Sequence, residues 1–255
     1  MRTPGACSVA VLAFAIATSA ASPGGGAPGK VTRALFSHGD RRITYYLFVP
    51  AKPTEPASAP LVVLLHGSGR DGTSLMDPWK ELAEKEGIVL LAPDAENRQG
   101  WSVPRDGPDP LCSLVDHLRQ AVPAINARRM YLFGHSAGAV FLLHMAMLQS
   151  DYFAAGALHA GAWRSPDEFF AVETLGRKIP LALTVGDADQ FFPVADVRAT
   201  AEALKKAGVP VTTEIIPDHN HNYYVVAGRV NAWAWAALKG HALARDPAYV
   251  HREFR

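Results

Sequence analysis

The chain has 255 residues, of which 49% are apolar and 19% are charged. Its 25 basic and 24 acidic side chains leave a net charge of +1. This balance provides no basic field to attract nucleic acid or an anionic membrane, and no acidic field to repel carboxylated substrates. A chain of this length and apolar content can fill one large core, so we expect a single α/β domain over residues 31–240.

The N-terminus differs in composition from the rest of the chain. Arg2 precedes the apolar run Val9 to Ala17, and the small residues Thr18 to Ser22 resemble a signal-peptidase site. The run is shorter than the ~20 residues that span a bilayer, which disfavours an uncleaved anchor. We therefore predict a signal peptide over residues 1–21, a flexible Pro/Gly linker over 22–30, and a secreted or periplasmic protein without stable membrane insertion.

Strands and helices alternate along the remainder. The expected strands are a leading antiparallel pair, Val31 to Ser37 and Ile43 to Val49, and then Leu61 to Leu65, Ile88 to Ala92, Met130 to Phe133, Ala154 to Ala160, Pro180 to Val185 and Val209 to Ile216. The expected helices cover Thr73 to Glu86, Leu111 to Leu118, Ala139 to Leu148, Ala195 to Ala207 and Val230 to Lys239. Repeated β-α units of this length predict a mostly parallel sheet with helices on both faces. Residues 241–255 form a tail that we leave unassigned.

A glycine-rich loop follows the first of the fully apolar strands. Leu61 to Leu65 predicts a strand buried on both faces, and His66-Gly67-Ser68-Gly69 comes directly after it. Glycines allow backbone N–H groups to turn toward a ligand. The loop is compatible both with an ordinary strand-to-helix connection and with half of an oxyanion hole.

The segment Gly134-His135-Ser136-Ala137-Gly138 lies between an apolar strand and a helix. A Gly-x-Ser-x-Gly turn in this context is a nucleophile elbow, which lifts the serine hydroxyl above the sheet. The N–H of Ala137 then sits at a helix N-terminus, where unpaired donors favour negative charge. The pattern predicts Ser136 as a catalytic nucleophile and Ala137 as an oxyanion donor.

Candidate acids and bases follow the two later strands. Asp187 and Asp189 come after Pro180 to Val185, at the sheet edge where the serine is expected, and either carboxylate is able to orient a histidine. His219 and His221 follow the last strand and, being two residues apart, point to one side of an extended segment. Residue type alone leaves both choices open. No metal-ligand spacing supports a zinc site in the chain, so we expect neither metal nor cofactor.

From about Ala34 to Leu238 the chain resembles α/β-hydrolase serine esterases, in particular the family of polyhydroxybutyrate depolymerases, feruloyl and acetylxylan esterases, and small carboxylesterases. The likeness is carried by Arg42 to Pro50, the helix around Asp116, Asn126 to Gly138, Asp218 to Tyr224 and Asn231 to Trp233. The resemblance implies Ser136, Asp189 and His221 as a catalytic triad, with the N–H groups of Ser68 and Ala137 as the oxyanion hole. The acid then precedes the base, as in that fold.

The resemblance also implies a reaction, the hydrolysis of carboxylic esters through an acyl-enzyme. Aromatic residues near the same sheet edge are candidates for a substrate pocket, namely Trp101, Trp163, Phe191, Phe192, Tyr223 and Tyr224. No long insertion resembling a lid lies between Leu148 and Pro180, so we expect small soluble esters as substrates. Two alternatives remain, a serine peptidase of the prolyl-oligopeptidase type and a non-catalytic binding protein of the same fold.

Overall fold

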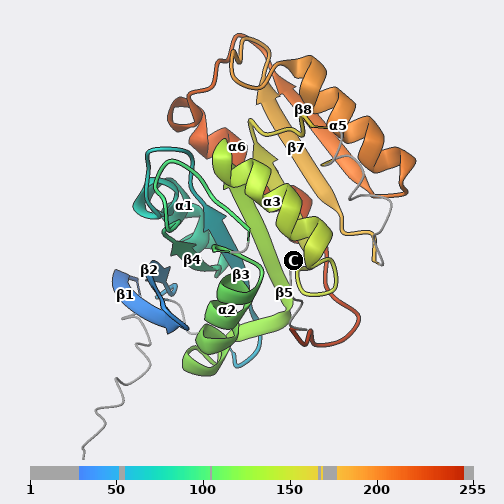
Figure 1. Ribbon diagram of the computed structural model, residues 1–255. Helices are drawn as coiled ribbons and strands as arrows, with labels where there is room; N and C mark the ends of the chain where they lie inside the picture. Colours follow the sequence, from blue (N-terminus) through green and yellow to red (C-terminus); the bar gives the residue numbers. More distant parts are fainter. Residues whose placement is uncertain (1–28, 52–54, 104, 166–167, 169–176, 250–255) are drawn as a thin grey trace, which may run out of the picture.

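The computed structural model describes residues 29–51, 55–103, 105–165, 168 and 177–249. The predicted signal peptide and nearly all of the predicted linker lie outside these ranges. Part of the segment between Leu148 and Pro180, where no lid is expected, also lies outside them. Figure 1 shows a twisted sheet flanked by helices. In the described part of the chain the sheet has eight strands, whose spatial order is β1 (Val31–His38), β2 (Arg41–Phe48), β4 (Val89–Pro93), β3 (Ala59–Leu65), β5 (Ile125–His135), β6 (Ala155–His159), β7 (Leu181–Gly186) and β8 (Val211–Ile216).

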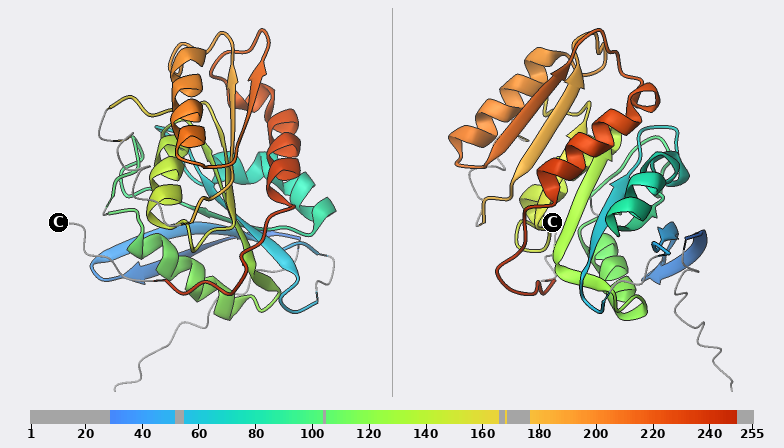
Figure 2. Two further views of the ribbon diagram at one scale, coloured as in Figure 1. Left: turned by 90° about the vertical axis from the view of Figure 1, so that its right-hand side faces the viewer. Right: turned by 180° about the vertical axis from the view of Figure 1, so that it is seen from behind.

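The strands from β4 to β8 are parallel, whereas β2 is antiparallel to both of its neighbours. One face of the sheet carries α2 (Asp109–Ala121), α3 (Ala137–Leu148) and α5 (Val194–Lys206), and the other carries α1 (Thr73–Glu86) and α6 (Ala227–Leu238). Figure 2 shows α1 and α6 together from behind. The predicted fold class, a mostly parallel sheet covered on both faces, is confirmed.

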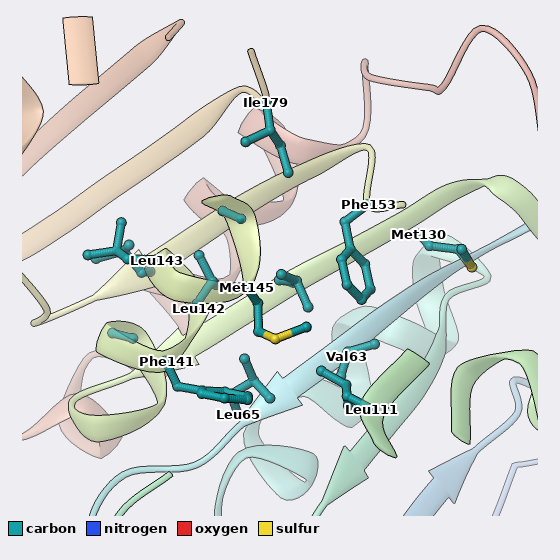
Figure 3. Packing of buried hydrophobic residues seen from close by; sticks show 14 of the residues in the cluster. Val63, Leu65, Leu111, Met130, Phe141, Leu142, Leu143, Met145, Phe153 and Ile179 are labelled. Atoms are coloured by element: carbon teal, nitrogen blue, oxygen red, sulfur yellow. The ribbon is translucent and has the colours of Figure 1, made fainter. Parts of the chain in front are cut away.

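Strand β3 shows why the sheet is covered on both faces. Its side chains alternate between the two apolar clusters, with Val63 and Leu65 on the α3 face and Val62 and Leu64 on the α1 face. All four are fully buried, as expected for a strand between two helical layers. In Figure 3, Leu65 lies beside Phe141 of α3, and Val63 lies beside Leu111 of α2. This packing fixes the position of the loop that leaves β3.

Two elements begin three or more residues before their predicted starts. Strand β5 begins at Ile125, five residues before the apolar run, because Ile125 pairs with Ala59 before the register shifts. Helix α6 begins at Ala227, where Gly228 weakens the helical signal. The one-turn 3₁₀ helix η2 (Tyr223–Val225) precedes it and was not predicted.

The first residues of the unassigned tail pack against the domain. Leu243 is buried and its N–H donates to the carbonyl of Arg128, while the Tyr131 hydroxyl donates to the carbonyl of His241. Among the described helices, none combines the length and the apolar character that a bilayer span requires.

Candidate active site

Ser136 lies at the sharp turn between β5 and α3, in a backbone conformation that residues with a side chain rarely adopt, with φ 55° and ψ −120°. Its flanking glycines are required by close approach of the backbone. A Cβ on Gly138 would lie 2.0 Å from the carbonyl oxygen of Leu65, and one on Gly134 would lie 2.4 Å from that of Gly138. The turn therefore has the geometry of a nucleophile elbow.

The hydroxyl of Ser136 meets an imidazole and a carboxylate that come from two other loops. His221 Nε2 is 2.9 Å from Ser136 Oγ, and His221 Nδ1 is 2.8 Å from Asp189 Oδ2. Asp189 follows β7 and His221 follows β8, so parallel strands bring the three residues to one edge of the sheet. This is the arrangement of nucleophile, base and orienting acid.

The carboxylate of Asp189 is fully buried and has three donors. Besides His221, the backbone N–H groups of Phe191 and Phe192 donate to its Oδ1 at 2.8 and 2.9 Å. Burial tends to raise the pKa of Asp189, but the bond from His221 and the two N–H groups outweigh it and hold that pKa below its ordinary value. Asp189 thus stays ionised and fixes the Nδ1–H tautomer of His221.

Asp187 and His219, the alternative candidates for the acid and the base, lie away from Ser136. Asp187 is exposed and accepts a hydrogen bond from the backbone N–H of His219 at 3.3 Å, so it shapes the turn. His219 is buried, with its ring 5.5 Å from that of His159. The structure therefore brings Asp189 and His221, rather than Asp187 and His219, to Ser136. The ring of His219 packs against that of His159, behind the site.

The wall behind His221 is made of neutral histidines. His135 and His159 approach with their Nδ1 atoms 3.1 Å apart, and the ring of His135 lies 5.0 Å from that of His221. Burial, with the neighbouring histidines, lowers the pKa of His135 to about 3 and that of His159 to about 2. Within the described ranges, no group of three or more His, Cys, Asp or Glu residues is placed to hold a metal ion.

The loop after β3 lies directly beside the serine. A Cβ on Gly67 would be 3.3 Å from that of Ser136. Among the described contacts, the backbone N–H groups of Ser68 and Ala137, the two predicted oxyanion donors, donate no hydrogen bond and are available to an acceptor. His66 braces the loop, with Nδ1 2.9 Å from the Gly67 carbonyl and Nε2 3.1 Å from the Ala95 N–H.

Ser136 opens into a cavity of ≈ 420 Å³. Its lining consists of Gly67, Ser68, Arg70, His135, Ser136, Gln190, Phe191, Asn220, His221, Asn222, Tyr223 and Tyr224. Phe191 is 65% exposed, whereas the side chain of Tyr223 is buried and its hydroxyl donates to Asn231. Arg70 and the amides of Gln190, Asn220 and Asn222 were not predicted, because single polar residues in loops give no sequence signal.

Three aromatic residues predicted for the pocket, Trp101, Trp163 and Phe192, are absent from that lining. Trp163 is 1% exposed and belongs to the core, with its backbone N–H donating to Thr200. Trp101 stacks on Phe141 at 5.0 Å, and its Nε1–H donates to the carbonyl of His66 at 2.8 Å. Trp101 therefore supports the loop after β3 and does not form a wall of the cavity. Phe192 is also mostly buried and stacks against the ring of His221.

In sequence the chain is similar to esterases and related hydrolases. A family model described as phospholipase/carboxylesterase matches residues 109–227. The candidate esterase NocK of Nocardia uniformis subsp. tsuyamanensis is 31% identical over 166 residues, which are 60% of this chain and 46% of NocK. The poly(3-hydroxybutyrate) depolymerase of Ralstonia pickettii is 25% identical over 177 residues, which are 61% of this chain and 36% of the depolymerase. The chain thus spans less than half the length of either curated relative.

The solved structures agree on the fold. A thermostable carboxyl esterase from Bacillus coagulans has a TM-score of 0.68 at 14% identity, covering 82% of this chain and 98% of that chain. Structures of peptidases superpose comparably. The chain shares the fold of these solved hydrolases. In sequence it is similar to the phospholipase/carboxylesterase family model and to the two relatives, an esterase and a depolymerase.

Proposed function

We propose that the chain is a carboxylic ester hydrolase with Ser136 as nucleophile, His221 as general base and Asp189 as the orienting acid. The observation that supports this most directly is the pair of contacts made by His221, at 2.9 Å to Ser136 and at 2.8 Å to Asp189. Three residues far apart in the sequence form this chain of hydrogen bonds at the edge of the sheet where the strained serine lies.

The proposed reaction follows the usual two steps of serine hydrolases. His221 Nε2 takes the proton of Ser136 as the oxygen attacks the ester carbonyl, and the N–H groups of Ser68 and Ala137 stabilise the negative oxygen. His221 then protonates the leaving alcohol, and an acyl-enzyme forms on Ser136. Water, deprotonated by His221, releases the acid. The cavity volume suits esters of modest size.

Replacing Ser136 by alanine tests the proposal. We expect kcat/KM for p-nitrophenyl butyrate to fall roughly 10⁶-fold, the scale measured when a serine hydrolase loses its nucleophile. The far-UV circular dichroism should be unchanged. Ser58→Ala is a matched control, because Ser58 is an exposed serine before β3. Activity of Ser136→Ala within a few-fold of the wild type would refute the assignment.

Two further experiments separate the alternatives. Labelling with a fluorophosphonate probe requires an activated serine, so a binding protein that lacks catalysis would stay unlabelled, whereas we expect one adduct at Ser136. Parallel assays on amino-acid p-nitroanilides and p-nitrophenyl esters distinguish a peptidase from an esterase. We expect kcat/KM to be higher for the esters than for the anilides. The ratio should exceed the ratio of their uncatalysed hydrolysis rates by several orders of magnitude.

We also propose that the protein is exported, on the basis of the sequence pattern in residues 1–21. Cell fractionation followed by N-terminal sequencing tests this. We expect mature protein in the periplasm or medium, beginning at Ala21 or Ser22. Recovery of chains that retain Met1 from the cytoplasm alone would contradict export.

A further inference from the structure

Arg70 is the single formally charged arginine, lysine, aspartate or glutamate among the residues that line the cavity of Ser136. The other polar groups around it include the side-chain amides of Gln190, Asn220 and Asn222, which offer N–H donors. Because none of the lining residues is acidic, the cavity has a positive wall with donors and no built-in counter-ion.

The guanidinium of Arg70 is held at this wall by its surroundings. Its Cζ lies 5.3 Å from the centroid of the Tyr224 ring, in a cation–π contact. Both backbone groups of Arg70 are hydrogen-bonded: its N–H donates to the Gly67 carbonyl, and its carbonyl accepts from Arg98 Nε. Tyr224 is fixed in turn, because its N–H donates to the Asn222 side chain. The exposed Arg70 thus lines the same cavity as Ser136, with its guanidinium against the ring of Tyr224.

Neighbouring arginines have carboxylate partners, and Arg70 has none in the described part of the chain. Arg98 pairs with Asp71 at 2.7 Å, so the acid nearest to Arg70 in sequence is already engaged. Arg105 pairs with both Asp40 and Glu96. The positive charge of Arg70 is therefore available to a ligand in the cavity. The pKa of His135 is lowered mainly by burial and by His221, and the charge of Arg70 makes a smaller contribution in the same direction.

We propose that Arg70 binds a carboxylate on the ester substrate, so that the preferred substrates are esters that carry a free carboxylate. This inference rests on the proposed ester hydrolysis and specifies its substrate class. A guanidinium binds a carboxylate through two parallel N–H donors, and among the described residues no hydrogen bond or ion pair engages those of Arg70. The carboxylate belongs either to the acyl part or to the alcohol part of the ester.

Two pairs of substrates of similar shape distinguish these parts. Monoethyl succinate and ethyl 4-methylpentanoate differ by a carboxylate or an isopropyl group on the acyl side. Acetoxyacetate and isobutyl acetate differ in the same way on the alcohol side. For each pair, proton release gives the ratio of kcat/KM for the charged and the neutral ester. Comparing this ratio between variants cancels the difference in intrinsic reactivity.

We expect the ratio for one of the pairs to fall about tenfold in Arg70→Gln, which keeps much of the side-chain length but loses the charge, and to recover in large part in Arg70→Lys. Arg229→Gln is the matched control, since Arg229 pairs with Glu214 outside the cavity and its loss should leave both ratios unchanged. If neither ratio changes by more than twofold in Arg70→Gln, the proposal is overturned and Arg70 serves only to pack on Tyr224.

A binding measurement separates this proposal from the proposed reaction. Ser136→Ala should bind monoethyl succinate or acetoxyacetate in calorimetry, and the double variant with Arg70→Gln should bind the same ester about tenfold more weakly. If the wild type cleaves none of the four esters but this difference in affinity is found, the proposed reaction fails and the carboxylate site stands. If the wild type cleaves the esters and the affinities are equal, the carboxylate site fails alone.

Discussion

The two ends of the parallel strands each carry a hollow, and the larger one lacks the features of a catalytic site. At the amino ends of β3 and β5 lies a cavity of ≈ 700 Å³ lined by Asp116, Arg119 and Asp246 among others. Two of its charged residues pair with each other, since Arg119 donates to Asp116 at 2.9 Å. The cavity at the carboxyl ends is ≈ 420 Å³ and contains the strained Ser136.

The comparison shows that the candidate site is distinguished by the reactive side chains and hydrogen-bond donors that meet around Ser136, and not by the volume of its cavity. At the amino ends, Asp116 also accepts a bond from the Tyr152 hydroxyl, so the polar groups there stabilise the fold. At the carboxyl ends, backbone donors at Ser68 and Ala137 and the cation of Arg70 are left available to a ligand. Parallel strands direct their following loops to this one edge, which is why ligands bind there in α/β folds.

The largest expected effect comes from the base. We expect His221→Ala to lower kcat/KM for p-nitrophenyl butyrate roughly 10⁶-fold, because among the described residues His221 is the base that contacts the Ser136 hydroxyl. His219→Ala should cost less than about tenfold, since His219 lies behind the site. At the opposite cavity, Arg119→Gln should leave the rate within about twofold. An inactive His219 variant beside an active His221 variant would reverse the assignment.

A smaller effect, on stability, tests the close approach at the elbow. Gly138→Ala places a methyl group against the Leu65 carbonyl, and we expect it to lower the free energy of unfolding by about 3 kcal/mol in urea titrations. Gly228→Ala is the matched control within α6, where a Cβ meets nothing within 4 Å. This variant should be stabilised by about 0.5–1 kcal/mol. Equal stability of both variants would contradict the packing at the elbow.

The smallest effect concerns pH and the buried histidines. Burial lowers the pKa of His66, His135, His159 and His219 in the folded state. The unfolded chain therefore binds more protons below the ordinary histidine pKa of about 6.5. Their contribution to stability is fully present above that pH and decreases as the pH falls from about 6.5 toward the folded values.

For one such histidine, the free energy of unfolding should fall by about 1.5 kcal/mol between pH 6.5 and 5. Urea titrations across this range measure the slope, and His159→Gln, which cannot be protonated there, should reduce it by about one proton. The same slope in the variant and in the wild type would show that His159 takes up a proton without unfolding.

Much of the fold could be predicted from the sequence, because each element carries its own periodicity. Val62 and Val63 point to opposite faces of the sheet, and each face has its own apolar cluster. Because both faces are buried, the strand is an unbroken apolar run in the sequence, and the sequence could therefore predict it. The start of β5 at Ile125 was not predicted, because its first half, Asn126 to Arg129, is polar and gives no apolar signal. This half belongs to the strand because β5 pairs with β3 from Ile125 onward. Local pattern cannot show hydrogen bonds to a distant strand.

The candidate site divides in the same way. The turn around Ser136 has a local cause, the need for side-chain-free neighbours, and its residues were therefore found. The pocket was predicted only in part: Phe191 lines the cavity, whereas Trp101 and Trp163 do not, and Arg70 was not expected. Whether an aromatic ring faces a cavity or a core depends on the elements packed against it, which spacing along the chain does not record.

The sequence by itself determined the order of strands and helices, the glycine-flanked serine and the set of acids and histidines that follow the later strands. Residue type left Asp187 and Asp189, and His219 and His221, as alternatives, and the resemblance favoured Asp189 and His221. The tertiary structure brings those two to Ser136, and it alone decided which side chains reach the cavity. The reason is physical. Backbone propensity and apolar periodicity act over a few residues, whereas a hydrogen bond between Asp189 and His221 depends on the register of β7 beside β8, which the whole sheet fixes.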